Sequence, residues 1–189
     1  MDACMTEAQA IRRLKKGDIG GMEELVALHQ QKALRTACLI TRDEETAKDA
    51  VQETFLRVYQ RIRYFDESRP FEPYLLRSVV NVAINMAEKR SKEVGLDDEL
   101  TPAEVELLIN RATSTEDQVE YRQLKQEILN GISRLTPRER AVIVERYYLE
   151  LSEKEMAERH DVAPGTVKWL LNGARKKLRS FMGLESDPS

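Results

Sequence analysis

The sequence predicts an all-α protein made of two small helical domains that an acidic linker joins. Its 189 residues are 41% hydrophobic, 6% aromatic and 33% charged, with only 8 Gly and 6 Pro, which favours a soluble helical protein over a sheet protein or a disordered chain. The charge is uneven, since residues 91–120 carry two basic and nine acidic side chains, a net charge of −7. We therefore divide the chain into a first domain over 1–90, a linker over 91–117, a second domain over 118–182 and a tail over 183–189.

Helix starts are marked by capping boxes, in which Ser or Thr is followed three residues later by Glu or Gln. Nothing in the sequence indicates paired strands or hairpins that would compete with these helices. The four boxes are Thr6 with Gln9, Thr101 with Glu104, Thr136 with Glu139, and Ser152 with Glu155.

The first domain is expected to be a helical bundle. Beyond the helix that Thr6 begins, a helix is expected over Met22 to Ile40. Two further segments repeat apolar residues every three to four positions, which predicts a buried stripe on each helix. The stripes are Ala47, Val51, Phe55, Val58 and Ile62 in the segment Glu45 to Ile62, and Leu75, Val79, Val82 and Met86 in the segment Tyr74 to Arg90.

The linker is acidic at its start, through Asp97, Asp98 and Glu99, and polar at its end. The box at Thr101 predicts one short helix within it, over Thr101 to Arg111.

The second domain shows the spacing of a helix-turn-helix motif. Helices are expected over Arg138 to Leu149, Ser152 to Arg159 and Pro164 to Phe181, with only His160 to Ala163 between the last two. Val162 is expected to fill the corner, and Ala157 is small enough for the helices to approach closely. The expected interior is Met156, Val162, Val167, Leu171, Ala174 and Leu178.

The last helix has the positive charge that a phosphate-binding surface requires. No acidic residue occurs from Val162 to Leu184, whereas five basic residues crowd this stretch. In a helix-turn-helix the second helix enters the major groove, reads base edges with its first turns and contacts phosphate with its basic side chains. We expect base contacts from Thr166, Lys168, Trp169 and Asn172, and backbone contacts from Arg175, Lys176 and Arg179.

Two other interpretations of this helix stay open. The basic residues near its end are also typical of a solvated amphipathic helix, because cations near a helix C-terminus interact favourably with the helix dipole. Trp169 is equally suited to partly buried packing.

The helix around Asp49 has a second face that is not part of its apolar stripe. Leu56 lies there among polar residues, which favours a partner surface over a plain solvated face. The face consists of Asp49, Gln52, Glu53 and Leu56.

The chain resembles the extracytoplasmic-function (ECF, or group 4) sigma factors of the sigma-70 family. The resemblance covers about residues 20–90 and 120–182, with two separate signatures in the expected order. It is carried by the strings DAVQETFLRVYQRI, FDESRPFEPYLLRSVVNVAINMAEKR and LTPRERAVIVERYYLELSEKEMAERHDVAPGTVKWLLNGARKKLRSF.

The resemblance implies a transcription initiation factor that directs core RNA polymerase to promoters, with a region 2 domain, a linker and a region 4 domain. It implies partners in the beta-prime and beta subunits of polymerase, in promoter DNA and in an anti-sigma factor that holds both domains. The residues implied in contact with the beta-prime coiled coil are Asp49, Gln52, Glu53, Phe55 and Leu56.

The resemblance also implies that region 2 captures unpaired bases of the −10 element, which requires stacking surfaces, amides and cations. Phe65, Phe71 and Tyr74 are alternatively core aromatics. The residues implied in −10 binding are Phe65, Arg69, Tyr74, Arg77, Asn81 and Asn85, with Lys89 and Arg90 on the backbone.

Several positions depart from the family pattern. Val80 stands where the family often has Arg, and Asn85 where it often has Asp. In the last helix TVKWLLNGAR replaces the common TVKSRLHRAR, and Gly173 weakens the helix by about 1 kcal/mol relative to Ala. We therefore expect an atypical −35 sequence or weak contacts to it.

Two other function classes stay open. The helix-turn-helix could serve an operator-binding regulator that acts without polymerase, usually as a dimer. A sigma-like protein with eroded DNA surfaces and a role in protein interaction is the second alternative.

Catalysis, cofactors and a metal site are not expected. His29 and His160 have no paired ligands at metal spacing, and no phosphate loop or nucleophile motif is present. Cys4 and Cys38 fit ordinary thiols in a cytoplasmic protein, and no apolar stretch is long enough for membrane contact by the chain itself.

Overall fold

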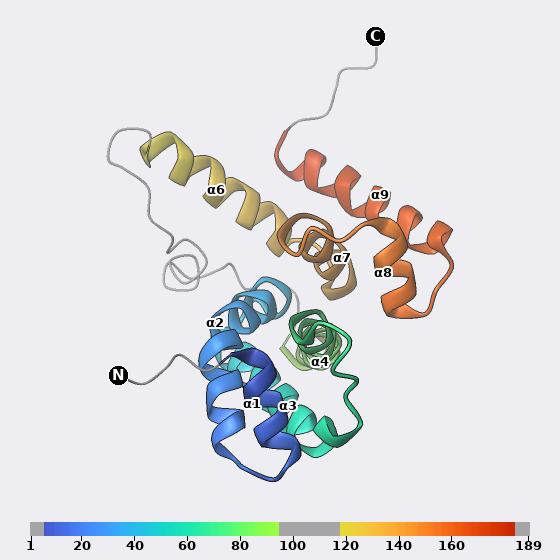
Figure 1. Ribbon diagram of the computed structural model, residues 1–189. Coiled ribbons are helices and arrows are strands. Elements are labelled where there is room, and N and C mark those ends of the chain that lie inside the picture. Colours follow the sequence, from blue (N-terminus) through green and yellow to red (C-terminus); the bar gives the residue numbers. More distant parts are fainter. Residues whose placement is uncertain (1–5, 95–117, 184–189) are drawn as a thin grey trace.

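The computed structural model describes residues 6–94 and 118–183, and every regular element within these ranges is helical. The all-α prediction is thereby confirmed for this part of the chain, while the helix expected over Thr101 to Arg111 lies outside it. Helices α1 to α4 form the lower bundle in Figure 1, and α6 to α9 lie above it. The elements are α1 (Glu7–Lys15), α2 (Gly20–Thr41), α3 (Glu44–Arg61), the 3-10 turn η1 (Ile62–Tyr64), α4 (Phe71–Val94), α6 (Gln118–Ser133), α7 (Pro137–Ile143), the π-helical turn η2 (Val144–Tyr148), α8 (Glu153–His160) and α9 (Pro164–Phe181).

The lower bundle packs around one apolar core. Leu25 and Ile40 of α2 and Phe71 and Leu75 of α4 are fully buried there. The stripe predicted on α3 is buried along its length, and that on α4 is buried except for Met86, which is half-buried. The helical periodicity of the sequence therefore identified the faces that build this core.

Replacing Gly21 by Ala should destabilise the protein by about 1 to 3 kcal/mol, because α1 crosses α2 at this residue. A Cβ atom there would lie 2.3 Å from the carbonyl oxygen of Ala10 and 2.8 Å from the amide nitrogen of Leu14, so the backbone of α1 would have to move. Gly173→Ala is the matched control, since nothing lies within 4 Å of its added Cβ. The control should gain about 1 kcal/mol from helix propensity. Urea unfolding of both variants measures this, and equal shifts would contradict the close crossing.

Three of the four capping boxes are confirmed. They are the boxes at Thr6, Thr136 and Ser152. In each, the hydroxyl oxygen accepts a hydrogen bond from the backbone amide of the residue three positions later, and the side chain of that residue accepts one from the backbone amide of the Ser or Thr. The fourth, at Thr101, lies outside the described residues. Pro137 and Pro164 occupy first-turn positions, where a missing amide costs little.

The helix-turn-helix is present with two corrections. The helix expected over Arg138 to Leu149 is α-helical only to Ile143 and then widens into η2, where the amide of Leu149 donates to the carbonyl of Val144 at 3.0 Å. Val162 does not fill the corner but is 40% exposed, because Met156 and Leu171 already close this core. The other expected interior residues are buried or half-buried.

The upper helices do not stand apart from the lower bundle. Ala141 and Val144 belong to the same buried cluster as the lower core, and α7 and η2 contact α2 while α7 also contacts α4. The two parts of the chain therefore share apolar packing, which the sequence patterns did not predict.

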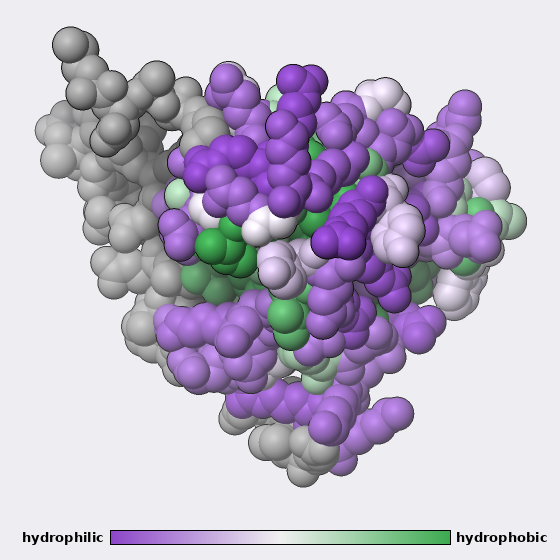
Figure 2. Space-filling view, turned by 60° about the horizontal axis from the view of Figure 1, so that its bottom comes forward, coloured by the Kyte–Doolittle hydropathy of each residue, from purple (hydrophilic) through white to green (hydrophobic). Residues whose placement is uncertain are grey.

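The surface is largely polar. Figure 2 shows a mainly hydrophilic face on which apolar side chains gather in small patches. No helix within the described ranges is long and apolar enough to span a lipid bilayer.

Candidate protein and nucleic-acid interfaces

The outer face of α3 is open, as the sequence predicted. Asp49 and Gln52 are exposed. Leu56, one turn further along the helix, is 54% exposed. Glu53 lies beside them and accepts a hydrogen bond from Arg57 at 2.7 Å. This face combines an apolar side chain with carboxylate and amide groups, a composition suited to a protein partner.

Phe55 differs in exposure from the other residues expected to contact a partner through this helix. Its ring is buried and lines a groove of about 740 Å³ between α2 and α3, together with Val26, Leu34 and Val51. Phe55 is a member of the apolar stripe, so the ring points inward where Asp49 and Leu56 point outward. It can shape a docking surface but does not project from it.

An aromatic cluster closes the end of the lower bundle. The ring of Phe65 makes an edge contact with Phe71 at 5.5 Å between centroids and lies 5.0 Å from the ring of Tyr74. Phe65 is buried, so in this structure its ring packs against Phe71 and Tyr74, and its part in −10 binding stays a prediction. Tyr64, which the sequence analysis did not single out, is 89% exposed because η1 turns it out of the helix.

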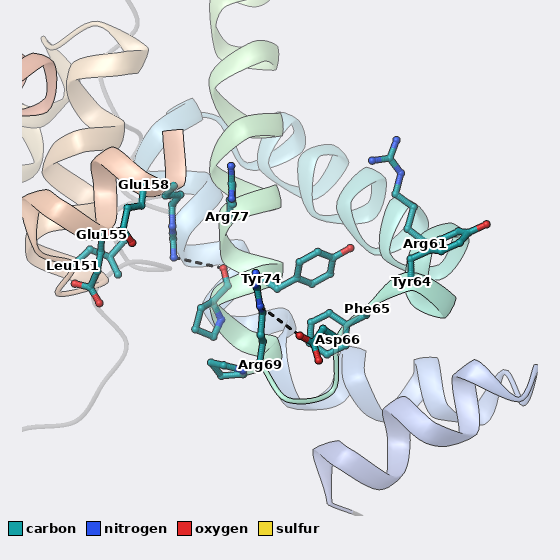
Figure 3. A pocket seen from close by; sticks show the side chains of 13 residues that line it. Arg61, Tyr64, Phe65, Asp66, Arg69, Tyr74, Arg77, Leu151, Glu155 and Glu158 are labelled. Atoms are coloured by element: carbon teal, nitrogen blue, oxygen red, sulfur yellow. Dashed lines mark hydrogen bonds and ion pairs between the residues drawn. The ribbon is translucent and has the colours of Figure 1, made fainter. Parts of the chain in front are cut away.

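A pocket of about 930 Å³ opens beside this cluster. Its walls come from the end of α3 and η1, from the loop before α4, from α4 itself and from α8 (Figure 3). Arg61, Arg69, Arg77 and Asp66 line it from the lower bundle, and Glu155, Glu158 and Arg159 line it from α8. A cationic wall beside aromatic residues is suited to phosphate and bases.

The loop between Phe65 and Pro70 is held in place from α1. Lys15 donates to the Phe65 carbonyl at 2.7 Å and to Glu67 at 2.9 Å, and Arg12 adds an ion pair to Glu67. Hydrogen bonds from Lys15 and Arg12 lower the pKa of the Glu67 carboxyl, and hydrogen bonds from Ser68 lower the pKa of Asp66. The loop is thus pre-organised around ionised carboxylates.

Four polar side chains form a ladder along α4. Arg77, Asn81, Asn85 and Lys89 are all exposed and recur every four residues, so they share one helix face. Two amides between two cations can follow a nucleic-acid strand over about three helical turns.

Arg90 is not part of this ladder. Its guanidinium pairs at 2.5 Å with Asp43, whose carboxylate caps the first turn of α3 through the amide of Thr46. Although burial raises the pKa of Asp43, hydrogen bonds from Thr46 and Arg90 hold it below its ordinary value. In this structure Arg90 therefore links α3 to α4 through an ion pair, and its contact with the DNA backbone stays a prediction.

Helix α9 presents the basic face that the sequence predicted. Thr166, Lys168, Asn172, Lys176 and Arg179 are exposed. Trp169, for which buried packing was an alternative, is 76% exposed, so the ring is available for contact.

Arg175 is held by a residue that the sequence analysis did not single out. Its Nε donates to the hydroxyl of Tyr147 at 2.8 Å, its guanidinium lies 5.7 Å from the centroid of the Tyr147 ring, and its Nη1 donates to Asn172. Tyr147 therefore orders the guanidinium on the face that is available to DNA.

A buried ionic cluster was also missed. Glu145 of η2 is fully buried, with one carboxylate oxygen 2.6 Å from Nε2 of His160 and the other 3.5 Å from Nη1 of Arg159. It joins η2 to the end of α8 from inside the helix-turn-helix. Within the described residues no group of three or more His, Cys, Asp or Glu side chains is arranged to hold a metal ion.

Two family models match the chain, Sigma-70 region 2 over residues 25–93 and Sigma-70 region 4 over residues 125–178. A curated relative, the ECF RNA polymerase sigma factor SigW of Bacillus subtilis, is 30% identical over 173 residues, which is 89% of this chain and 92% of SigW. The chain belongs to the ECF sigma factors of the sigma-70 family.

Solved structures agree with the fold of this ECF sigma factor. The structure of CnrH in complex with the cytosolic domain of CnrY aligns with a TM-score of 0.62 at 20% identity and covers 95% of this chain and 99% of CnrH. The sigma factor RpoE of Bartonella quintana, in complex with the anti-sigma factor NepR, aligns with a TM-score of 0.61 at 19% identity over 87% of this chain and 98% of RpoE. The region 2 match covers α3 and most of α2 and α4, and the region 4 match covers α7, α8 and most of α6 and α9.

Proposed function

We propose that this ECF sigma factor carries core RNA polymerase to a specific class of promoters and helps to open their −10 element. One observation carries the proposal: a single chain matches both sigma-70 regions in order, and each region presents an exposed face of the chemistry that its task requires. The domain limits that belong to this proposal are residues 1–90, 91–117 and 118–182.

The polymerase-binding surface is the outer face of α3. Leu56 supplies the apolar anchor, and Asp49, Gln52 and Glu53 surround it with groups that fix orientation. The beta-prime coiled coil is the partner of this face, with Phe55 supporting it from the groove behind.

The −10 surface is the α4 ladder together with the pocket at its start. Arg77, Asn81, Asn85 and Lys89 follow the unpaired strand, and Arg69 contributes a cation from the loop. Tyr64 is the exposed aromatic on which a base can stack, while Phe65 and Tyr74 form the wall behind it.

The −35 surface is α9. Its first turns bring Thr166, Lys168, Trp169 and Asn172 to base edges, and Arg175, Lys176 and Arg179 contact phosphate.

Reversing the charge of Arg175 should weaken −35 duplex binding by roughly tenfold and reduce the salt slope by about one, since one phosphate contact is lost. Tyr147→Phe should give a smaller loss of affinity, because the ring remains under the guanidinium while the hydroxyl acceptor is gone. Lys154→Glu, on the exposed side of α8, is the control. Fluorescence anisotropy of isolated duplexes across a salt series measures both the affinity and its salt slope. An unchanged slope for Arg175→Glu would show that Arg175 makes no such phosphate contact.

The proposal includes an anti-sigma factor and a cytoplasmic location. Two of the solved structures that the fold resembles are complexes, CnrH with CnrY and RpoE with the anti-sigma factor NepR, which supports an inhibitor for this chain as well. Its function as an initiation factor requires binding and strand capture but no catalysis by its own residues.

Run-off transcription with purified core polymerase and a library of genomic fragments tests the proposal. We expect promoter-dependent transcripts whose start sites share a −10 and a −35 sequence, and no specific product with core alone. An operator-binding regulator would instead form a stable dimer that binds duplex DNA without core, and a sigma-like protein with eroded DNA surfaces would not bind −10 single strands. Either result, in the absence of specific transcripts, would overturn the proposal.

A further inference from the structure

Helix α1 lies outside both family matches. The Sigma-70 region 2 match begins at residue 25 and the region 4 match covers residues 125–178, so neither includes Glu7–Lys15. The proposed function assigns no task to this helix either. Its contacts nevertheless lead directly to the loop that borders the proposed −10 site.

The apolar side of α1 is fixed on the lower bundle. Ala10, Ile11 and Leu14 are at most 4% exposed and belong to the apolar cluster of that bundle. At Gly21 of α2 the two helices cross so closely that an added Cβ atom would force the backbone of α1 to shift. Close packing of this kind prevents α1 from sliding, so its polar side can hold a neighbouring segment in place.

Two cations on the polar side of α1 reach the loop from Phe65 to Pro70. Nζ of Lys15 donates a hydrogen bond to the carbonyl oxygen of Phe65 at 2.7 Å and another to Oε1 of Glu67 at 2.9 Å. Nε of Arg12 donates to Oε2 of Glu67 at 3.1 Å. One backbone carbonyl and both oxygens of one carboxylate are therefore bonded to a helix that lies 50 or more positions earlier in the sequence.

The loop meets the pocket and α1 through different side chains. Asp66 and Arg69 line the pocket of about 930 Å³ beside the aromatic cluster (Figure 3). Glu67, Lys15 and Arg12 do not line this pocket. The two cations of α1 therefore act on a base in the pocket only through the position that they give to the loop.

The internal hydrogen bonds of the loop fix its shape but not its place. Oδ1 of Asp66 accepts hydrogen bonds from the amide and the hydroxyl of Ser68 at 3.0 and 2.7 Å, and the amide of Arg69 donates to the Asp66 carbonyl at 3.1 Å. These bonds join residues two or three positions apart. Because the buried rings of Phe65 and Phe71 anchor only the two ends of the segment, the bonds from α1 are what ties its middle to the bundle.

From these contacts we infer that Lys15 and Arg12 are positioning residues for base selection at the −10 element, and that they act by holding the loop where its pocket side distinguishes one base from another. The inference rests on the proposed function, because it concerns the same −10 site. Groups that read a base must be held within about 0.5 Å of their productive position. A loosened loop should therefore cost more in discrimination between bases than in total binding.

The same contacts contribute little to the stability of the whole bundle. The side chains of Arg12 and Glu67 are 67% and 36% exposed, and ion pairs at such positions are weak. Their removal should loosen the loop without unfolding the protein. This difference separates a positioning role from a purely structural one.

Lys15→Met tests the inference by removing both donated hydrogen bonds while keeping a side chain of similar length. Lys16→Met removes the same charge from the adjacent, exposed position and is the matched control. Lys15→Arg keeps a cationic donor and is the rescue variant. Each full-length variant is bound to core polymerase, and fluorescence anisotropy measures its affinity for −10 single strands that carry each of the four bases in turn at every position.

We expect Lys15→Met to lower the preference for the best base by about tenfold at one position or more of the element, with Lys16→Met and Lys15→Arg close to the wild type. Arg12→Gln removes one bond to Glu67 at an exposed side chain, so it should cause a smaller loss of the same preference. This second variant carries the test if Lys15→Met does not fold.

Amide hydrogen exchange of the free chain measures the loop itself. Exchange over residues 66–69 should become faster in Lys15→Met and stay unchanged in Lys16→Met. Unchanged exchange, or faster exchange with full base preference, would overturn the inference. An equal loss of affinity for all four bases, with a salt slope reduced by about one, would also overturn it, because Lys15 would then be a direct phosphate contact.

The wild-type holoenzyme separates a failure of this inference from a failure of the proposed function. If it gives no promoter-dependent transcripts, the proposed function falls, and the inference with it, before any variant is compared. If the wild type selects −10 bases and Lys15→Met keeps that selection, the inference alone falls.

Discussion

Replacing Leu56 by Asp should lower the affinity of the chain for core RNA polymerase by about thirtyfold or more. Leu56 is an exposed aliphatic side chain beside the polar residues Gln52 and Glu53 on the outer face of α3, and such central anchors contribute about 2 kcal/mol or more to binding. Asp adds an unpaired charge to the surface that must lose water on binding, which increases the loss. Titration of fluorescently labelled chain with purified core measures the affinity.

Leu28→Asp is the matched control for this prediction. Leu28 is also an exposed leucine, on α2, and it does not line the groove behind α3. Its substitution should change neither the core affinity nor the thermal stability by a comparable amount. Equal losses in both variants would show that general surface hydrophobicity, and not the α3 face, determines the affinity.

Replacing Glu145 by Ala should lower the free energy of unfolding by about 3 to 5 kcal/mol. The carboxylate is fully buried in η2 and faces both His160 and Arg159, so its loss leaves the buried Arg159 guanidinium without its countercharge. Burial already lowers the pKa of Arg159, and Glu145 opposes that effect by favouring the charged form. Urea unfolding followed by circular dichroism measures the change.

Two variants separate the charge from the shape of this side chain. Glu145→Gln keeps a side chain of the same size that can still bond to His160, so its loss should be smaller than that of Glu145→Ala. Glu158→Ala removes an exposed carboxylate of α8 and should change stability by less than about 0.5 kcal/mol. If Glu145→Ala were no more destabilising than Glu158→Ala, the buried cluster would have no structural role.

The fold was largely predictable because it follows from local signals. The capping boxes at Thr6, Thr136 and Ser152 and the stripes on α3 and α4 each depend on a few neighbouring residues in the sequence. The π-helical turn after Ile143 was not predictable in the same way, because a single widened turn leaves the apolar spacing nearly unchanged.

The exposed faces of the candidate sites were predictable, but the burial and the pairing of individual side chains were not. Asp49, Leu56 and Trp169 are exposed as their positions on the helix faces require. Phe65 and Arg90 have the chemistry of nucleic-acid contacts, but Phe65 packs against Phe71 across the loop and Arg90 pairs with Asp43, which lies far from it in sequence.

Long-range pairs account for the remaining differences. Arg140 and Ile40 are 100 positions apart, and Arg175 and Tyr147 are 28 apart. No periodicity or short motif contains such a pair, so the shared core of the two regions and the ordering of Arg175 became visible only in three dimensions.

The central claim is that this chain associates with core RNA polymerase as an initiation subunit, and competition for core tests it most directly. Labelled full-length chain and purified core are mixed, and a known sigma factor is then added in increasing amounts. The account predicts a stable complex that the known factor displaces, because two sigma factors should compete for the same binding surface on core. Absence of a complex, under conditions in which the known factor binds the same core preparation, would contradict it.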